Sequence, residues 1–401
     1  MARPSGRLPT VTGLYVCLAT AALAASLVPS LSLHARQMGA SAPEVGLVAA
    51  APLIIASVAL HRVSGRHILE HRRLALAATA LLAIVPPLCC LATAPWQLLC
   101  LRALLGLALF PTCNAAAIDP LRTQSRFLGP WAPAGWIVGP LLAGIAAESW
   151  GLGYSFLVAG LLGAAALAAL VVDGQFAPCL GNPLEPPESP ISAPGSLVLG
   201  IAAAALAAFL PLYAGDAKLG PTQVGALFAG AALAALAAFR LVERVDFTYP
   251  VTLTVGSILL GALACAGLAF STALPAFVAT ATLIGLALGG AAAATGALRD
   301  EPELASPPGL HAGQTALAFA PPLIGVGIVL LGEEAMFLLG SIALAAAAVG
   351  AAILLPTASA LGTQESNEGP PFAAELAKAD GVDEAPVADA NLEPAAHYPS
   401  A

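Results

Sequence analysis

The sequence predicts an all-α integral membrane protein with twelve transmembrane helices, arranged as two pseudo-symmetric six-helix bundles. The first observation is composition, because 59% of the 401 residues are hydrophobic and only 9% are charged. A soluble domain has about 25% charged residues, so this chain has too few charges to cover a water-exposed surface. The second observation is a series of apolar runs, and the third is an internal repeat of about 180 residues, as in duplicated membrane carriers.

Each membrane-spanning helix needs roughly 20 apolar residues, and twelve such runs follow one another along the chain. Six precede a polar interruption, at 11–33, 43–60, 74–93, 96–118, 127–147 and 151–172. Six follow it, at 195–214, 221–239, 250–271, 274–297, 311–332 and 334–356. Most of the apolar residues are Ala and Leu, and Gly is frequent. This composition favours closely packed helices over a β-barrel.

The polar segments divide the chain into four expected parts. These are a six-helix bundle at 1–172, a cytoplasmic linker at 173–194, a second bundle at 195–356 and a cytoplasmic tail at 357–401. The linker is rich in proline, which is typical of a flexible connection. The tail carries eight acidic residues against the single Lys378, and its low hydrophobicity and dense charge predict disorder. It therefore accounts for most of the net charge of −8.

The internal repeat is visible at the first helix of each bundle. Pro29 precedes Arg36 by seven residues, and Pro211 precedes Lys218 by the same distance. Each run then enters the next helix through a polar-Val-Gly sequence, at 44–46 and 223–225. The first run could also be a cleaved signal peptide, since Arg3 precedes it. Because its partner in the repeat lies in mid-chain, we expect the first run to be retained.

Basic residues predict the orientation of the helices. A cytoplasmic N-terminus places most of them on the cytoplasmic side, and only Arg36 and Lys218 fall outside. This agrees with the excess of Lys and Arg found in cytoplasmic loops. We therefore expect both termini in the cytoplasm and the chain in a bacterial inner membrane.

Several classes of function are disfavoured by the residues that are present. The acidic balance argues against a nucleic-acid partner. The seven cysteines are odd in number and lie mostly in apolar runs, so neither a disulfide framework nor a metal site is expected. No paired carboxylates or nucleophile motif indicate an enzyme, and no cofactor is expected. We expect a monomer in the lipid bilayer that acts on a small-molecule substrate.

The fifth run contains the most specific motif. It reads Gly135-Trp136-Ile137-Val138-Gly139-Pro140, followed by Gly144. Glycines four residues apart let another helix approach closely, and the proline removes a backbone hydrogen bond. In this motif and in its twelve runs, the chain resembles the major facilitator superfamily across roughly 11–356. The resemblance implies a drug or metabolite exporter that exchanges its substrate for protons.

Two further segments carry the same resemblance. In the fourth run, Arg102 and Gly106 match an Arg-x-x-x-Gly pattern, whose arginine is implicated in proton coupling in relatives. An arginine within a span should face an aqueous cavity or a partner, although Arg102 could instead reach the outer interface. The loop after the second run resembles a degraded gating motif. Its candidate residues are Gly65, Arg66, Glu70, Arg72 and Arg73, with Leu69 or Glu70 in the place of the family's aspartate.

The resemblance also indicates where a substrate pathway would lie. The candidates for transport or coupling are Arg102, Asn114, Asp119 and Gln314, although Asn114 and Gln314 could equally join helices. No acidic residue lies deep within a predicted span, whereas a proton exchanger usually needs a buried carboxylate. We therefore expect export of a small neutral or amphipathic molecule, with protons as a candidate coupled ion. The alternative is a sensor or assembly factor that uses the same scaffold without transporting.

Overall fold

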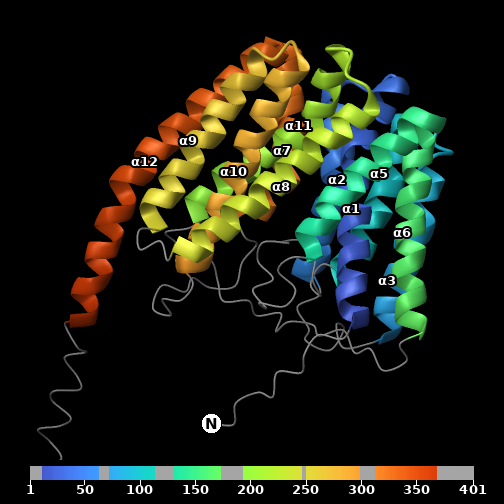
Figure 1. The fold of residues 1–401 in the computed structure, drawn as a ribbon, viewed down its shortest axis with the longest axis horizontal. Helices are drawn as coiled ribbons and strands as arrows, with labels where there is room; N and C mark the ends of the chain where they lie inside the picture. Colours follow the sequence, from blue (N-terminus) through green and yellow to red (C-terminus); the bar gives the residue numbers. More distant parts are fainter. Residues whose placement is uncertain are drawn as a thin grey trace, which may run out of the picture. The chain divides into compact units, whose positions relative to one another are not determined.

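The computed structural model describes residues 11–62, 72–112, 131–172, 193–245, 250–298 and 312–367 (Figure 1). These residues form twelve α-helices and no strand, as the sequence predicts. The first six are α1 (Val11–Gln37), α2 (Ala42–Arg62), α3 (Arg72–Cys89), α4 (Pro95–Thr112), α5 (Trp131–Trp150) and α6 (Leu152–Val172). The last six are α7 (Ala193–Asp216), α8 (Pro221–Val245), α9 (Pro250–Ala269), α10 (Leu274–Leu298), α11 (Ala312–Leu331) and α12 (Glu333–Asn367).

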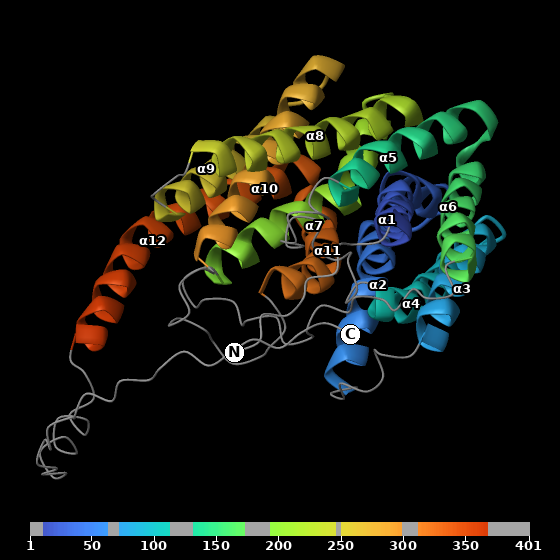
Figure 2. The ribbon, with the colours of Figure 1, turned by 60° about the horizontal axis from the view of Figure 1, so that its bottom comes forward.

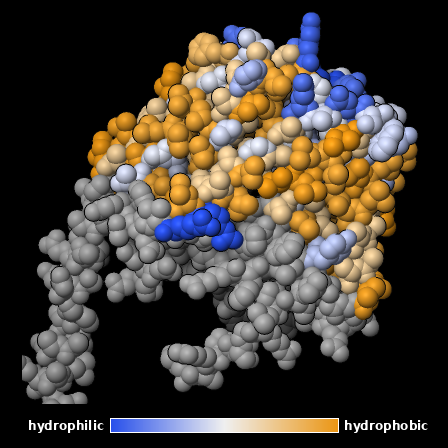
Figure 3. Space-filling view, viewed as in Figure 1, coloured by the Kyte–Doolittle hydropathy of each residue, from blue (hydrophilic) through white to orange (hydrophobic). Residues whose placement is uncertain are grey.

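Every predicted run falls on one helix, and several helices extend beyond their apolar run. The helix α12 continues through Asn367, past the predicted end of its run at Pro356. Within the described residues, six helices are long and apolar enough to cross a membrane by length and composition. These stretches are Leu18–Gln37, Leu152–Val172, Pro221–Val242, Val251–Ala269, Leu274–Ala294 and Glu333–Ile353. Figure 3 shows apolar side chains over much of the visible helix surface, with hydrophilic residues gathered at the top and in a smaller group at the lower edge.

Residues 1–355 form one compact unit, and residues 356–401 form a second. In the first unit, α1 packs against α5 and α6, and α3 packs against α4 and α6. In the second set of six helices, α10 packs against α8 and α9, while α7 packs against α11. Two extensive contacts join the first six helices to the last six, α5 with α8 and α2 with α11. Figure 2 shows α5 and α8 meeting. The predicted linker, bundle and tail boundaries stay predictions.

Short connections join the helices at one end of the compact unit, which we call the short-loop end. Its connections are residues 38–41, 90–94, 151, 217–220, 270–273 and 332. After α1, Gly39 has a φ of 83°, and the Ala40 N–H bonds the Ala35 carbonyl at 3.0 Å. This is the usual left-handed residue after a helix. A glycine fits there because it has no Cβ to clash in that conformation.

The turn after α7 has the same geometry but a different residue. Lys218 has a φ of 63°, and the Leu219 N–H bonds the Ala214 carbonyl at 2.9 Å. The structural counterpart of Gly39 is therefore Lys218. The sequence repeat had matched Lys218 with Arg36, which lies in the last turn of α1. That register is wrong at this turn, because spacing from a proline does not follow the residue that ends the helix.

Replacing Lys218 with glycine should stabilise the protein. Lys218 is the non-glycine residue with positive φ in the described part of the chain, and the left-handed conformation costs roughly 1–2 kcal/mol for a residue with a Cβ. We expect Lys218→Gly to raise the free energy of unfolding by about 1 kcal/mol. The thermal midpoint in detergent measures this change. A lower midpoint would show that the lysine side chain stabilises the turn.

Candidate functional site

Only some of the residues singled out in the sequence are among those that the structure describes. Gly65, Arg66, Glu70, Asn114 and Asp119 are outside the described residues. Arg72 and Arg73 begin α3, and Gln314 lies in the first turn of α11. The candidates whose side chains the structure describes are therefore Arg102 and the glycine motif of α5.

Arg102 lies on α4, where α1, α3 and α4 bring polar groups into the interior. Its Nε is buried without a hydrogen-bond partner, and its charge acts on the Cys89 thiol of α3. His34 of α1 packs against Phe156 of α6, with ring centroids 5.2 Å apart and planes at 62°. Both ring nitrogens of His34 are also buried without a partner. Unsatisfied buried groups are expensive, so this cluster is a plausible place for a ligand or a second conformation to supply partners.

Other polar residues near the predicted pathway already have partners. The Tyr213 hydroxyl donates to the Ala269 carbonyl at 3.4 Å, and the Tyr213 ring contacts Phe277 and Phe337. The Thr280 hydroxyl donates to the carbonyl of Ala276 at 2.8 Å, one helical turn earlier. The hydrogen of each hydroxyl is therefore already committed to a backbone carbonyl, which leaves the oxygen as an acceptor only. These side chains therefore contribute to packing first.

The first two glycines of the α5 motif face α1. A Cβ added to Gly135 would lie 2.7 Å from the Ala21 Cβ, the Ala22 nitrogen and the Leu18 carbonyl oxygen. A Cβ added to Gly139 would collide with the Ala22 carbonyl oxygen. The two helix backbones are therefore in direct contact, as expected for glycines at this spacing. This contact lies within the first six helices.

The rest of the motif faces α8. A Cβ on Gly144 would lie 2.6 Å from the Pro221 carbonyl oxygen, and one on Gly225 would collide with the Pro140 carbonyl oxygen. We call this contact, made by Pro140 and Gly144 of α5 with Pro221 and Gly225 of α8, the α5–α8 seam. The motif thus joins α5 to α1 on one face and to the last six helices on another.

A second seam repeats the first between α2 and α11. A Cβ on Gly46 would collide with the Pro321 carbonyl oxygen, and one on Gly325 would lie 2.5 Å from the Ala42 carbonyl oxygen. We call this contact the α2–α11 seam. Each helix of one seam has a counterpart in the other, with the glycine four residues beyond the proline in both α5 and α11. Sequence reasoning missed this pair, although Pro321 and Gly325 repeat the spacing of Pro140 and Gly144.

The two prolines of α11 do not interrupt it, in contrast to the break that consecutive prolines suggest. The helix is continuous from Ala312 to Leu331 with Pro321 and Pro322 inside. Proline removes a backbone donor, and packed neighbours make this tolerable in a membrane helix. The Pro321 carbonyl oxygen, which faces Gly46, is the point of closest approach to α2.

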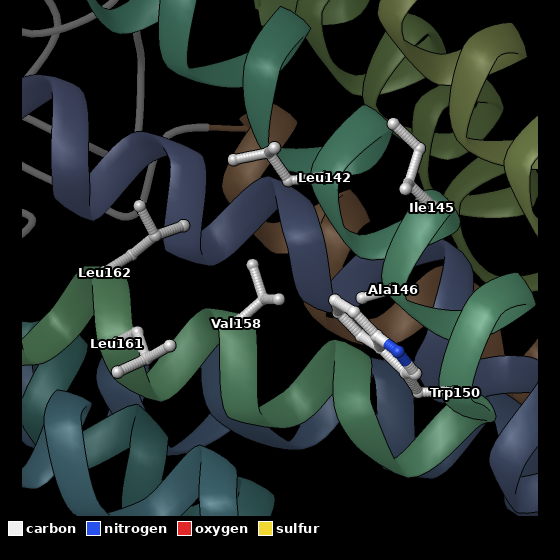
Figure 4. A pocket seen from close by; sticks show the side chains of 7 residues that line it. All are labelled: Leu142, Ile145, Ala146, Trp150, Val158, Leu161 and Leu162. Atoms are coloured by element: carbon white, nitrogen blue, oxygen red, sulfur yellow. The ribbon is translucent and has the colours of Figure 1, made fainter.

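An apolar groove of about 350 Å³ lies between α5 and α6 (Figure 4). It is lined by Leu142, Ile145, Ala146, Trp150, Val158, Leu161 and Leu162. Leu161 and Trp150 are 69% and 67% exposed, so the groove opens on the outside of the helices. A surface this apolar fits lipid chains, and the indole N–H of Trp150 is the polar group among its lining side chains.

Comparison with known proteins gives one match to a family model. The model, described as Major Facilitator Superfamily, covers residues 14–300. Two curated bacterial relatives are each named Multidrug resistance protein MdtG. The protein from Yersinia enterocolitica is 29% identical over 49% of this chain and 54% of its own length. The one from Serratia proteamaculans is 30% identical over 40% of this chain and 43% of its own length. The chain therefore matches about half of the length of these relatives.

Solved structures share the fold at low sequence identity. The nucleoside transporter NupG superposes with a TM-score of 0.62 at 11% identity, covering 86% of this chain and 99% of its own. A bacterial homologue of the human lysosomal transporter Spinster, inward-facing and unoccupied, gives a TM-score of 0.58 at 14% identity. That match covers 90% of this chain and 98% of the homologue. At these identities the likeness shows the fold alone.

Proposed function

Because the chain belongs to the major facilitator superfamily and is an integral membrane protein, we propose that it exports a small neutral or amphipathic molecule by alternating access. The single observation that carries this proposal is the pair of seams. The first six helices meet the last six at α5–α8 and α2–α11, through backbone surfaces at glycines. Such contacts can part as units, because the closest approaches at the glycines are made by helix backbones. Two related sets of helices can then rock about a central site.

Both seams lie toward the short-loop end. Gly46 and Gly225 are the fifth residues of α2 and α8, which begin there, and Gly144 and Gly325 lie six residues before the ends of α5 and α11. The arginine bias assigns this end to the outside. We therefore propose that the structure is closed toward the outside and that transport requires both seams to part.

Export, rather than uptake, is supported by the name of the two relatives and by the glycine motif of α5. A neutral or amphipathic substrate is supported by the apolar composition of the described helices, in which Arg102 is the one charged residue of α4. Protons are the coupled ion to test first. The Arg102 Nε and both ring nitrogens of His34 are buried without a hydrogen-bond partner. Binding of a substrate or a proton there would stabilise these groups by supplying what they lack.

Flux in reconstituted vesicles tests this function. We expect wild-type protein to move at least one compound of an amphipathic panel, and Arg102→Ala to slow that flux by about ten- to hundredfold if a charge-assisted hydrogen bond is lost. Leu104→Ala is the matched control, because Leu104 is an exposed residue of the same helix and should leave flux unchanged.

Two outcomes separate the alternatives. If wild-type vesicles are indistinguishable from empty vesicles for the whole panel, the scaffold is a sensor or assembly factor rather than a transporter. If flux occurs but is indifferent to an imposed pH gradient, export is driven by another ion or by the substrate gradient alone.

A further inference from the structure

The two seams differ in one polar contact, which is found at the end of α5. Glu148 lies one turn beyond Gly144, and its Oε2 accepts a hydrogen bond from the Thr222 backbone N–H at 3.1 Å. The same oxygen would lie 3.4 Å from a Cβ placed on Gly220. The carboxylate therefore sits over the residues that begin α8, although it belongs to a helix of the first six.

This contact supplies one acceptor at the N-terminus of α8. The first N–H groups of a helix have no partner within it. The Gln223 side chain accepts from the Gly220 N–H at 3.0 Å, and the Val224 N–H bonds the Gly220 carbonyl at 3.0 Å. Pro221 has no N–H. The Thr222 N–H takes its acceptor from another helix, and that acceptor, the Glu148 carboxylate, also brings a negative charge, which a helix N-terminus favours.

The α2–α11 seam shows what happens without such a contact. Counting from the glycines of each seam, Pro43 stands where α8 has Thr222, and Val329 of α11 stands where α5 has Glu148. A proline has no N–H to donate and a valine side chain has no acceptor. The α2–α11 seam therefore has neither the donor nor the acceptor of this contact. The start of α2 is closed by its own residues, with Glu44 accepting from the Ser41 N–H at 2.7 Å.

We propose that Glu148 is a polar clip of the α5–α8 seam: its carboxylate caps the start of α8 and favours the state in which the short-loop end is closed. The capping contact does not depend on the proposed function, and only its effect on transport rests on that function. The α5–α8 seam is then held by a hydrogen bond as well as by packing, and the α2–α11 seam by packing. The seam without a clip should part more easily.

The charge of Glu148 argues against a role for this residue in proton exchange. Hydrogen bonds from Thr222 lower the pKa of the Glu148 carboxyl, and burial opposes that shift weakly. A group with a lowered pKa in the closed state stabilises that state above its usual pKa, and the stabilisation is lost as the pH falls through the lowered value. Glu148 is therefore ionised at neutral pH, where it holds the seam without exchanging protons.

Hydrogen–deuterium exchange of the purified full chain tests the clip directly, without a substrate. In Glu148→Ala, the segment from Tyr213 to Phe228 should exchange about two- to fivefold faster than in the wild type, as expected for losing one charge at a helix N-terminus. Thr222→Pro removes the donor and makes α8 resemble α2, and it should give a similar increase. The double variant should exchange no faster than either single variant, because both remove one contact.

Two references make the result specific. Val329→Ala, at the matching position of the other seam, should leave the exchange of both seams unchanged. The segment from Leu33 to Val48 should be unaffected in every Glu148 variant. Unchanged exchange in Glu148→Ala and Thr222→Pro, or additive effects in the double variant, would overturn the clip. An equal increase in both segments would also overturn it, because the effect would then be general loosening.

The conservative variant Glu148→Gln covers the case in which alanine prevents folding. It keeps the shape and one acceptor and should give a smaller increase in exchange than alanine. If the variants show this exchange pattern but the wild-type protein moves no substrate, the clip stands and the proposed function is wrong. If the wild-type protein transports but the variants do not show the pattern, only the clip is wrong.

Discussion

Gly139→Ala is expected to lower the stability of the protein strongly, because the new methyl group has no room. It would collide with the Ala22 carbonyl oxygen and lie 2.9 Å from the Ala22 carbonyl carbon and 3.0 Å from its Cα. These are backbone atoms of a buried helix, so they cannot turn aside as the end of a side chain can. Overpacking typically costs about 1–3 kcal/mol, and we expect the upper end of that range. The thermal midpoint in detergent is the measurement.

Gly230→Ala is the matched control on another helix. No atom lies within 4 Å of a Cβ placed on Gly230. Alanine forms helix better than glycine by about 1 kcal/mol in water, so this change should leave the midpoint unchanged or raise it. Equal losses from Gly139→Ala and Gly230→Ala would mean that helix propensity, and not the α1–α5 contact, determines the effect.

The number and type of helices could be predicted from sequence because they follow from local physics. Bilayer thickness fixes the length of an apolar run, and each of the twelve runs became one helix. The exact ends of the helices were harder to predict from the sequence. The helix α12 extends beyond Pro356, where the sequence is no longer apolar. A helix can continue into polar sequence, since its backbone hydrogen bonds do not require apolar side chains.

The seams show what sequence patterns leave out. The spacing of Gly135 and Gly139 predicts that some helix approaches closely, but not that it is α1, because the partner is distant in the chain. The same limit hid the contact between Gly46 and Pro321. The repeat contained the missing information, since Pro321 and Gly325 reproduce the spacing in α5. Its register at the α7–α8 turn was misread, because a lysine occupies the left-handed position that a glycine holds after α1.

Glu148 was visible in the sequence only as an acidic residue at the end of a span. Its role depends on Thr222, which lies 74 residues away along the chain, and on which N–H groups of α8 remain unpaired. Capping within one helix has a local sequence signature, as at Ser41 and Glu44. A cap supplied by another helix has none, so it becomes apparent only when the helices are placed together.

Gly225→Ala is expected to open the α5–α8 seam without unfolding the helices. A Cβ at this position would collide with the Pro140 carbonyl oxygen and lie 3.0 Å from the carbonyl carbon. In contrast to the α1–α5 contact, this one joins the first six helices to the last six. The strain is therefore relieved if the two sets move apart. An overpacking cost of about 1–3 kcal/mol in the closed state alone shifts the population toward the open state by about five- to 150-fold.

A single cysteine beside the seam reports this shift. Val224 is fully buried next to Gly225, so Val224→Cys in a background without the seven native cysteines should react slowly with a membrane-impermeant maleimide. Adding Gly225→Ala should raise the labelling rate severalfold or more, while Gly230→Ala should not. The counterpart in the other seam is Val45→Cys with Gly46→Ala, which should behave alike because Gly46 meets Pro321 as Gly225 meets Pro140. Faster labelling accompanied by a large fall in the thermal midpoint would instead indicate unfolding. Unchanged labelling in both pairs would show that the seams do not part, and alternating access through them would be wrong.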